Sequence, residues 1–153
     1  MPGRVKCSVY NEDACHLINN ISGDILYLDP PYNDRQYCSN YHILETIARN
    51  DAPKIHGKTG LRNYESQKSL FCSKSRVYAA FENLIRDAKF KYIFLSYNNE
   101  GIMHAEEIES IMTKFGEYFV YDKDYQRFKS DRDENRKHKA KRTQEYIHCL
   151  IKD

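Results

Sequence analysis

The fold of this 153-residue chain is decided by one stretch, Asp24-Ile25-Leu26-Tyr27-Leu28-Asp29-Pro30-Pro31-Tyr32. Its first five residues have the length and the branched and aromatic content of a buried strand. Because the two prolines cannot continue a sheet ladder, the strand must end at Asp29. The sequence therefore predicts an acid, a rigid turn and an aromatic ring at the carboxyl end of a strand, where open α/β sheets bind their ligands.

These residues suit the recognition of a flat, amino-bearing ring. The Asp29 carboxylate and the Pro30 carbonyl are two hydrogen-bond acceptors close together, and the Tyr32 ring offers a stacking face. Such a set fits the exocyclic amine of a nucleobase taken out of its helix. The same residues also fit an ordinary turn after a strand, and the tetrapeptide alone does not separate the two interpretations.

Further blocks follow the tetrapeptide in a fixed order, namely Arg35-Gln36-Tyr37, Tyr41-His42 with Leu44-Glu45, Ser96-Tyr97-Asn98-Asn99-Glu100, and Tyr125-Gln126-Arg127-Phe128-Lys129-Ser130. Together with residues 27–33, this series resembles the amino-methyltransferases that modify adenine in DNA, and within them the bacterial Dam-like branch of restriction-modification systems. The resemblance covers about Val5 to Ile151. It implies an α/β fold, which is a partial Rossmann-like sheet of mixed strands with helices on both faces. It also implies that the protein uses S-adenosylmethionine (AdoMet). Residues 1–153 would then form a single partial catalytic domain.

The resemblance also assigns roles to individual residues. It implies that Asp29, Pro30, Pro31 and Tyr32 are catalytic, and that Asp13, Ala14 and Asp29 contact the cofactor. Acceptors at Asp29 and Pro30 would localise the lone pair of the adenine 6-amino group and stabilise the charge that develops on it. For Asp13 there is a simpler explanation, because an acid at the start of a helix is usually a cap.

The basic residues predict a double-stranded DNA partner. They gather in two connections, about residues 51–76 and 126–144, and the candidates for phosphate contact are Arg35, Lys58, Arg62, Arg127 and Lys129. Each neutralised phosphate would add salt-sensitive affinity. Solvated loops of the same composition are the alternative.

Composition narrows the class of protein. The net charge is +2, and the five cysteines are scattered without a Cys-x-x-Cys pair, which indicates reduced thiols rather than zinc or a disulfide framework. No apolar run reaches membrane-spanning length. We therefore expect a cytoplasmic protein without a membrane segment. His42 and Glu45 lie three residues apart on an expected helix, but no second pair accompanies them, so we expect no metal site.

The remaining elements follow from periodicity and breakers. We expect further strands at 5–10, 90–97, 118–122 and 145–151, and helices at 11–19, 41–49, 77–89 and 105–115. A polar loop is expected at 33–40 and an irregular segment at 51–75.

One family feature is missing from the sequence. The resembled enzymes carry an aromatic-x-Gly-x-Gly loop near the cofactor, and no such pattern precedes Asp29. The chain therefore looks like the carboxyl-terminal catalytic half of a methyltransferase: a split-gene product needing a separate chain, an incomplete sequence or a decayed remnant. Residues 5–10 would lose their neighbours, residues 24–28 would become an exposed apolar edge, and AdoMet binding by this chain alone would be weak or absent. The competing functions are a cofactor-free DNA-binding or interaction module, and an enzyme acting on cytosine or RNA.

Overall fold

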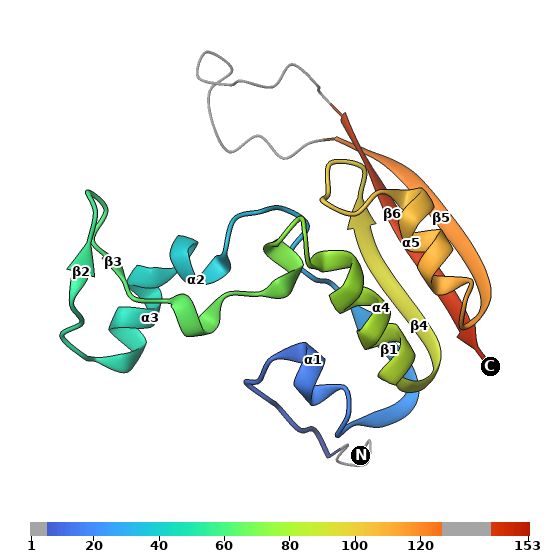
Figure 1. The fold of residues 1–153 in the computed structure, drawn as a ribbon, viewed down its shortest axis with the longest axis horizontal. Helices are drawn as coiled ribbons and strands as arrows, with labels where there is room; N and C mark the ends of the chain where they lie inside the picture. The colour runs from blue at the N-terminus through green and yellow to red at the C-terminus, as the bar shows by residue number, and fades with distance from the viewer. Residues whose placement is uncertain (1–5, 127–141) are drawn as a thin grey trace, which may run out of the picture.

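The computed structural model describes residues 6–126 and 142–153, which build a four-stranded sheet in the order β1-β4-β6-β5 (Figure 1). The strands are β1 (Ser22–Leu28), β4 (Lys89–Asn98), β5 (Gly116–Gln126) and β6 (Arg142–Lys152). β1 runs parallel to β4, and β6 is antiparallel to both of its neighbours. The predicted mixed sheet is confirmed, and the strands expected at 24–28, 90–97, 118–122 and 145–151 are all present.

One face of the sheet is covered by helices. α4 (Val77–Asp87) and α5 (Ala105–Met112) lie in front of the strands in Figure 1, and α1 (Ala14–Leu17) contacts α4. Both large helices were expected, because their apolar residues recur at helical spacing. They bury a core made of Phe81, Ile85 and Ile108 from the helices and Ile93, Leu95 and Leu150 from the sheet.

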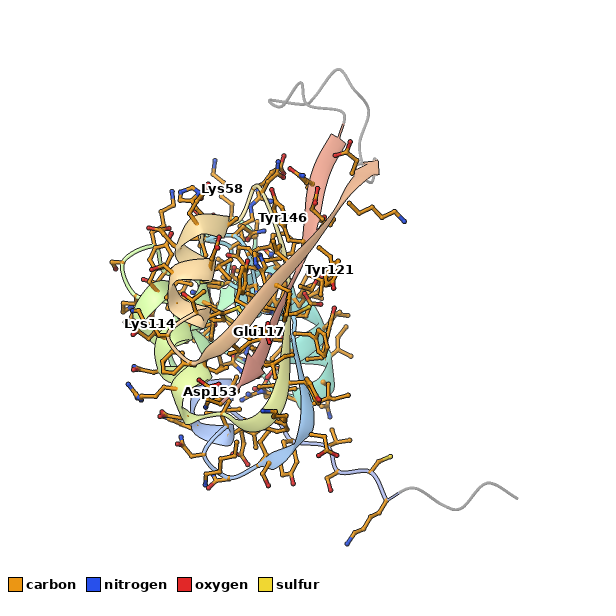
Figure 2. All side chains as sticks on the ribbon, turned by 90° about the vertical axis from the view of Figure 1, so that its right-hand side faces the viewer. Lys58, Lys114, Glu117, Tyr121, Tyr146 and Asp153 are labelled. Atoms are coloured by element: carbon orange, nitrogen blue, oxygen red, sulfur yellow. The ribbon has the colours of Figure 1, made fainter. Side chains whose placement is uncertain are left out.

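The opposite face of the sheet carries no helix from the described residues, so the prediction of helices on both faces is wrong for this part of the chain. Side chains alternate along a strand, and Tyr27, Phe94, Cys149 and Phe119 stand in register across the four strands on this second face. Tyr27 is 60% exposed and Tyr121 is 67% exposed. In Figure 2 the labelled Tyr121 lies on the side of β5 away from α5. We call this surface the open face.

β1 is the edge of the sheet, as the sequence predicted. It pairs with β4 on one side and with no described strand on the other. The strand expected at 5–10 is wrong over its described residues, 6–10, which are exposed and adopt no regular structure. A strand needs a neighbour for its backbone hydrogen bonds, and no described strand lies beside these residues.

Residues 37–72 form an extension at the carboxyl end of β1 (Figure 1). It contains α2 (Tyr37–Asn40), α3 (His42–Arg49), the hairpin β2 (Ile55–His56) and β3 (Leu61–Arg62), and two 3₁₀ turns, η1 (Glu65–Gln67) and η2 (Leu70–Cys72). Only α3 was expected from the sequence. The hairpin turn has Gly57 and Gly60 at positive φ, which glycine adopts without a steric penalty. Among the residues described, no helix is both long and apolar enough to cross a bilayer.

Candidate active site

The predicted tetrapeptide leaves the sheet at the carboxyl end of β1, directly after the last pair of that strand, Leu28 with Leu95. Asp29 is exposed, and no described residue makes a hydrogen bond or an ion pair with its carboxylate. The Pro30 carbonyl likewise accepts no hydrogen bond from the described part of the chain. Both acceptors are therefore available to a ligand.

Asp29, Pro30 and Pro31 line a cavity of about 260 Å³. Its walls are apolar on the side of the core, where Phe71, Phe81 and Leu84 stand behind the tetrapeptide. Ala14 and Ser69 complete the lining from α1 and from the segment before η2. A carboxylate and a carbonyl beside an apolar wall suit a flat ring with a polar edge.

Asp13 begins α1 and caps it, because its Oδ1 accepts a hydrogen bond of 2.8 Å from the Cys15 amide. The simpler explanation of this residue is thus confirmed. Asp13 also lines a larger, polar cavity of about 630 Å³, together with Asn11, Tyr37, Tyr41, Glu45 and Lys68. Burial, followed by the charge of Asp13, raises the pKa of the Cys15 thiol to about 11, so this thiol stays protonated.

The two cavities adjoin each other. Ala14 and Ser69 line both, so the predicted cofactor residues Asp13, Ala14 and Asp29 border one continuous region of the surface. An extended ligand with a polar sugar and an apolar ring fits such a pair of cavities, since one is polar and the other is walled by aromatic and aliphatic side chains.

Tyr32 does not line the same cavity as Asp29. Its ring lines a third cavity of about 400 Å³, bordered by Tyr78, Gly101, Ile102 and His104. The Tyr32 and Tyr97 rings are perpendicular, with centroids 6.3 Å apart. The site therefore brings Asp29, Pro30 and Pro31 together in one cavity and sets Tyr32 at the mouth of another.

Two further residues, Gln36 and Tyr37, link the segments that line these cavities. No role was predicted for either residue from the sequence. Gln36 fixes the segment before η2 through two hydrogen bonds with Ser69. The Ser69 backbone amide donates to Gln36 Oε1 at 2.8 Å, and Gln36 Nε2 donates to the Ser69 carbonyl at 3.2 Å. The Tyr37 phenol has a raised pKa, because of burial first and then the charges of Tyr32 and Asp29. Tyr37 therefore lies within electrostatic reach of both predicted catalytic side chains. The block Arg35-Gln36-Tyr37 held the signal, but a polar loop gives no hint of these contacts.

The predicted DNA-contacting residues fall into three groups. Arg35 and Lys58 are exposed, and Lys58 lies in the hairpin turn with its side chain pointing outward (Figure 2). Arg62 is only 7% exposed and binds both Asp51 oxygens, at 2.6 and 3.2 Å, and Thr46 at 3.2 Å. Its guanidinium holds the pKa of Asp51 below the usual range, so the structure speaks against Arg62 as a phosphate ligand. Arg127 and Lys129 lie outside the described residues.

Within residues 6–126 and 142–153, no group of three or more His, Cys, Asp or Glu side chains is placed to hold a metal ion. His42 is buried at the start of α3, away from solvent, and Glu45 binds Arg49 instead.

Comparison with known proteins decides the family. Residues 2–111 match the D12 class N6 adenine-specific DNA methyltransferases. The chain belongs to this family. Among its relatives in the family, the type II methyltransferase M.NlaIII of Neisseria lactamica is 58% identical over 144 residues, which are 94% of this chain and 42% of the relative. The type II methyltransferase M.FokI of Planomicrobium okeanokoites is 51% identical over 147 residues, which are 94% of this chain and 22% of the relative.

This D12 chain thus spans less than half the length of either relative. The matched part contains the tetrapeptide and every cavity described above. No solved structure matches the chain.

Proposed function

We propose that this chain is the catalytic part of a DNA adenine methyltransferase of a restriction-modification system, and that residues 1–153 form one partial catalytic domain. The proposed reaction transfers a methyl group to the exocyclic amine of adenine in double-stranded DNA. The observation that carries the proposal is a pair of acceptors at the end of β1, the Asp29 carboxylate and the Pro30 carbonyl, which accept no hydrogen bond from residues 6–126 and 142–153. Family membership supports it.

The proposed chemistry follows from these acceptors. The adenine amine is a poor nucleophile because its lone pair is delocalised into the ring. Hydrogen bonds from the amine to Asp29 and Pro30 localise that pair and stabilise the positive charge that develops on nitrogen, which is an electrostatic effect concentrated in the transition state. In the proposed reaction, the Asp29 carboxylate also takes the proton that the amine loses.

We propose AdoMet as the methyl donor, which when bound supplies an electrophilic methyl group on sulfonium. The residues that would hold it are Asp13, Ala14 and Asp29, because the polar and apolar cavities meet at Ala14. We further propose that Arg35 and Lys58, both exposed, contact DNA phosphates. DNA in the cytoplasm is the proposed target, because the five cysteines are scattered along the sequence without a Cys-x-x-Cys pair and fit a compartment that keeps thiols reduced.

Nucleoside analysis tests the reaction. Plasmid DNA is incubated with AdoMet, this chain and the separately expressed segment of M.NlaIII that the chain does not match, then digested and examined by mass spectrometry. We expect N6-methyladenine, its loss in Asp29→Ala, and its retention in the nearby control Asp34→Ala. Methylated cytosine in place of methylated adenine would overturn the proposed substrate, and activity on RNA alone would overturn the proposed polymer.

We also propose that a separate polypeptide completes the enzyme, and the open face is the observation that favours it. Large apolar side chains on the open face are exposed, among them Ile25, Tyr27, Tyr92, Phe119 and Tyr121. An exposed patch of this kind marks a protein interaction site. The edge of β1 adds a row of backbone groups to which a partner strand can pair.

Size-exclusion chromatography of the same two polypeptides tests this association. We expect a heteromeric complex that is lost in Tyr121→Lys and Tyr27→Lys, because each buries a charge against the partner. The control is Ser110→Lys, which adds the same charge on the exposed side of α5. A chain that stays monomeric in the mixture, or a complex that survives both changes, would contradict the proposal, and self-association through this face would replace the partner by a second copy.

A further inference from the structure

Tyr97 is the buried member of a cluster at the carboxyl end of β4. Only 2% of its surface is exposed, although it carries a hydroxyl group. Its ring meets the Tyr32 ring edge to face, with centroids 6.3 Å apart and an interplanar angle of 87°. This geometry is a favourable one for aromatic pairs, so Tyr97 supports one side of the Tyr32 ring.

The segment 101–103 ties both tyrosines to the same support. The Ile102 amide donates a 2.9 Å hydrogen bond to the Tyr32 carbonyl, and the Met103 amide donates one of 3.3 Å to the Tyr97 hydroxyl. The Tyr78 hydroxyl from α4 in turn donates a 3.1 Å bond to the Ile102 carbonyl. The backbone of Tyr32 and the ring of Tyr97 are therefore fixed by consecutive amides, which are themselves anchored to α4.

Gly101 makes this arrangement possible. A Cβ at position 101 would lie 2.7 Å from Cζ of the Tyr97 ring, which is closer than real Cβ contacts allow. The bare Cα of Gly101 therefore lets the chain pass directly over that ring. Any side chain here would push Tyr97 away from the loop, and with it the support of Tyr32.

We infer that Tyr97 is a positioning residue, which holds the Tyr32 ring in a fixed orientation for stacking against the substrate base, and that Gly101 and Tyr78 maintain its position. This inference rests on the proposed function and on the stacking role that the sequence predicts for Tyr32. Stacking is strongest on a ring that is already oriented, since no further side-chain freedom is lost when the base arrives. A core residue without this role would leave the mobility of Tyr32 unchanged when it is replaced.

The chain contains no tryptophan, so Tyr32→Trp provides a single fluorescent reporter. We expect Tyr97→Leu in this background to raise acrylamide quenching by about twofold and to lower the anisotropy, since the indole ring loses its neighbour. Gly101→Ala should act in the same direction. Tyr97→Phe keeps the ring and should restore the parent values, and Tyr121→Leu, on the open face, serves as the control.

Circular dichroism of each variant shows whether the sheet and helices are retained. If Tyr97→Leu does not fold, Gly101→Ala carries the test alone. A folded variant with unchanged quenching and anisotropy overturns the inference.

A second measurement separates the inference from the proposed reaction. In the methylating mixture with wild-type Tyr32, we expect Tyr97→Leu to lower kcat and Tyr97→Phe to retain it. A fluorescence response without any methylation by the mixture supports the positioning of Tyr32 and overturns the proposed reaction. Methylation that is unaffected by Tyr97→Leu overturns the positioning role and leaves the proposed reaction standing.

Discussion

The two faces of the sheet differ in how far their side chains are buried. On one face, Ile93 and Leu95 are completely buried under α4 and α5. On the other, Tyr27 of β1 and Tyr121 of β5 remain largely exposed, although they belong to the same sheet. The side chains on both faces are apolar and aromatic. Both faces therefore have the composition of a buried surface, but the described residues cover only one of them.

This contrast distinguishes two questions. The first is whether the site residues are in position, and the second is whether the sheet around them is complete. The tetrapeptide that we propose as catalytic needs only β1, β4 and the segments that pack at their carboxyl ends, and these are in place. A second layer, which would close the open face and extend the sheet beyond β1, is not among the described residues. Acceptors that bind no described residue, beside an uncovered sheet, are what the proposed dependence on a second polypeptide requires.

The largest expected effect comes from a substitution in the core between the helices and the covered face of the sheet. Phe81 is fully buried between α4 and the sheet, so Phe81→Ala should lower the free energy of unfolding by about 3–5 kcal/mol. Tyr121→Ala on the open face should change it by less than about 0.5 kcal/mol. Urea denaturation measures both. Equal losses would show that the open face is already packed in the isolated chain.

The next effect concerns a titratable group hidden on the covered side. His148 is fully buried, its Nδ1 lies 2.7 Å from the Tyr118 hydroxyl, and no described residue hydrogen-bonds its Nε2. Burial lowers the pKa of His148 to about 4. Because the unfolded chain takes up a proton near pH 6.5 and the folded chain does not, stability present above pH 6.5 is lost as the pH falls towards 4.

We therefore expect the wild-type chain to lose about 2 kcal/mol more than His148→Gln between pH 7.5 and pH 5. Denaturation of both proteins at the two pH values provides the difference, which cancels the titration of other groups. Parallel pH profiles would contradict the lowered pKa, because they would mean that His148 takes up its proton at the same pH in the folded and the unfolded chain.

The smallest effects are expected for two basic residues of the extension, one buried and one exposed. Arg62 is buried against Asp51, which is itself partly exposed, so Arg62→Ala should destabilise the chain by about 1–2 kcal/mol. Lys58→Ala should leave stability unchanged. In fluorescence titrations with double-stranded DNA, the completed enzyme carrying Lys58→Ala should show a salt dependence of binding reduced by about one counterion. An unchanged slope would remove Lys58 from the DNA interface.

The sequence predicted the parts of the fold that depend on local pattern. The apolar runs of β1 and β4 predicted two strands, and the spacing of Val77, Phe81 and Leu84 predicted the buried side of α4. The burial expected for the first of these strands is wrong, because no residue of β1 is fully buried. The acceptors at Asp29 and Pro30 were found because two prolines must end a strand. These predictions needed no knowledge of distant neighbours.

What the sequence did not reveal depends on long-range partners. Arg62 looked like a phosphate ligand because nothing local shows that Asp51 and Thr46 enclose it. Residues 6–10 had a strand-like pattern, but a strand forms only beside another strand. Tyr37 sat in an apparent polar loop, and its proximity to Asp29 arises from the turn into α2.

Titration calorimetry with AdoMet tests most directly whether this chain holds a site that only a second polypeptide completes. The account predicts no heat beyond dilution when AdoMet is added to the isolated chain. It predicts binding with a micromolar Kd, an affinity of about −8 kcal/mol, once the unmatched segment of M.NlaIII is present. Binding of the same strength by the isolated chain would contradict the account.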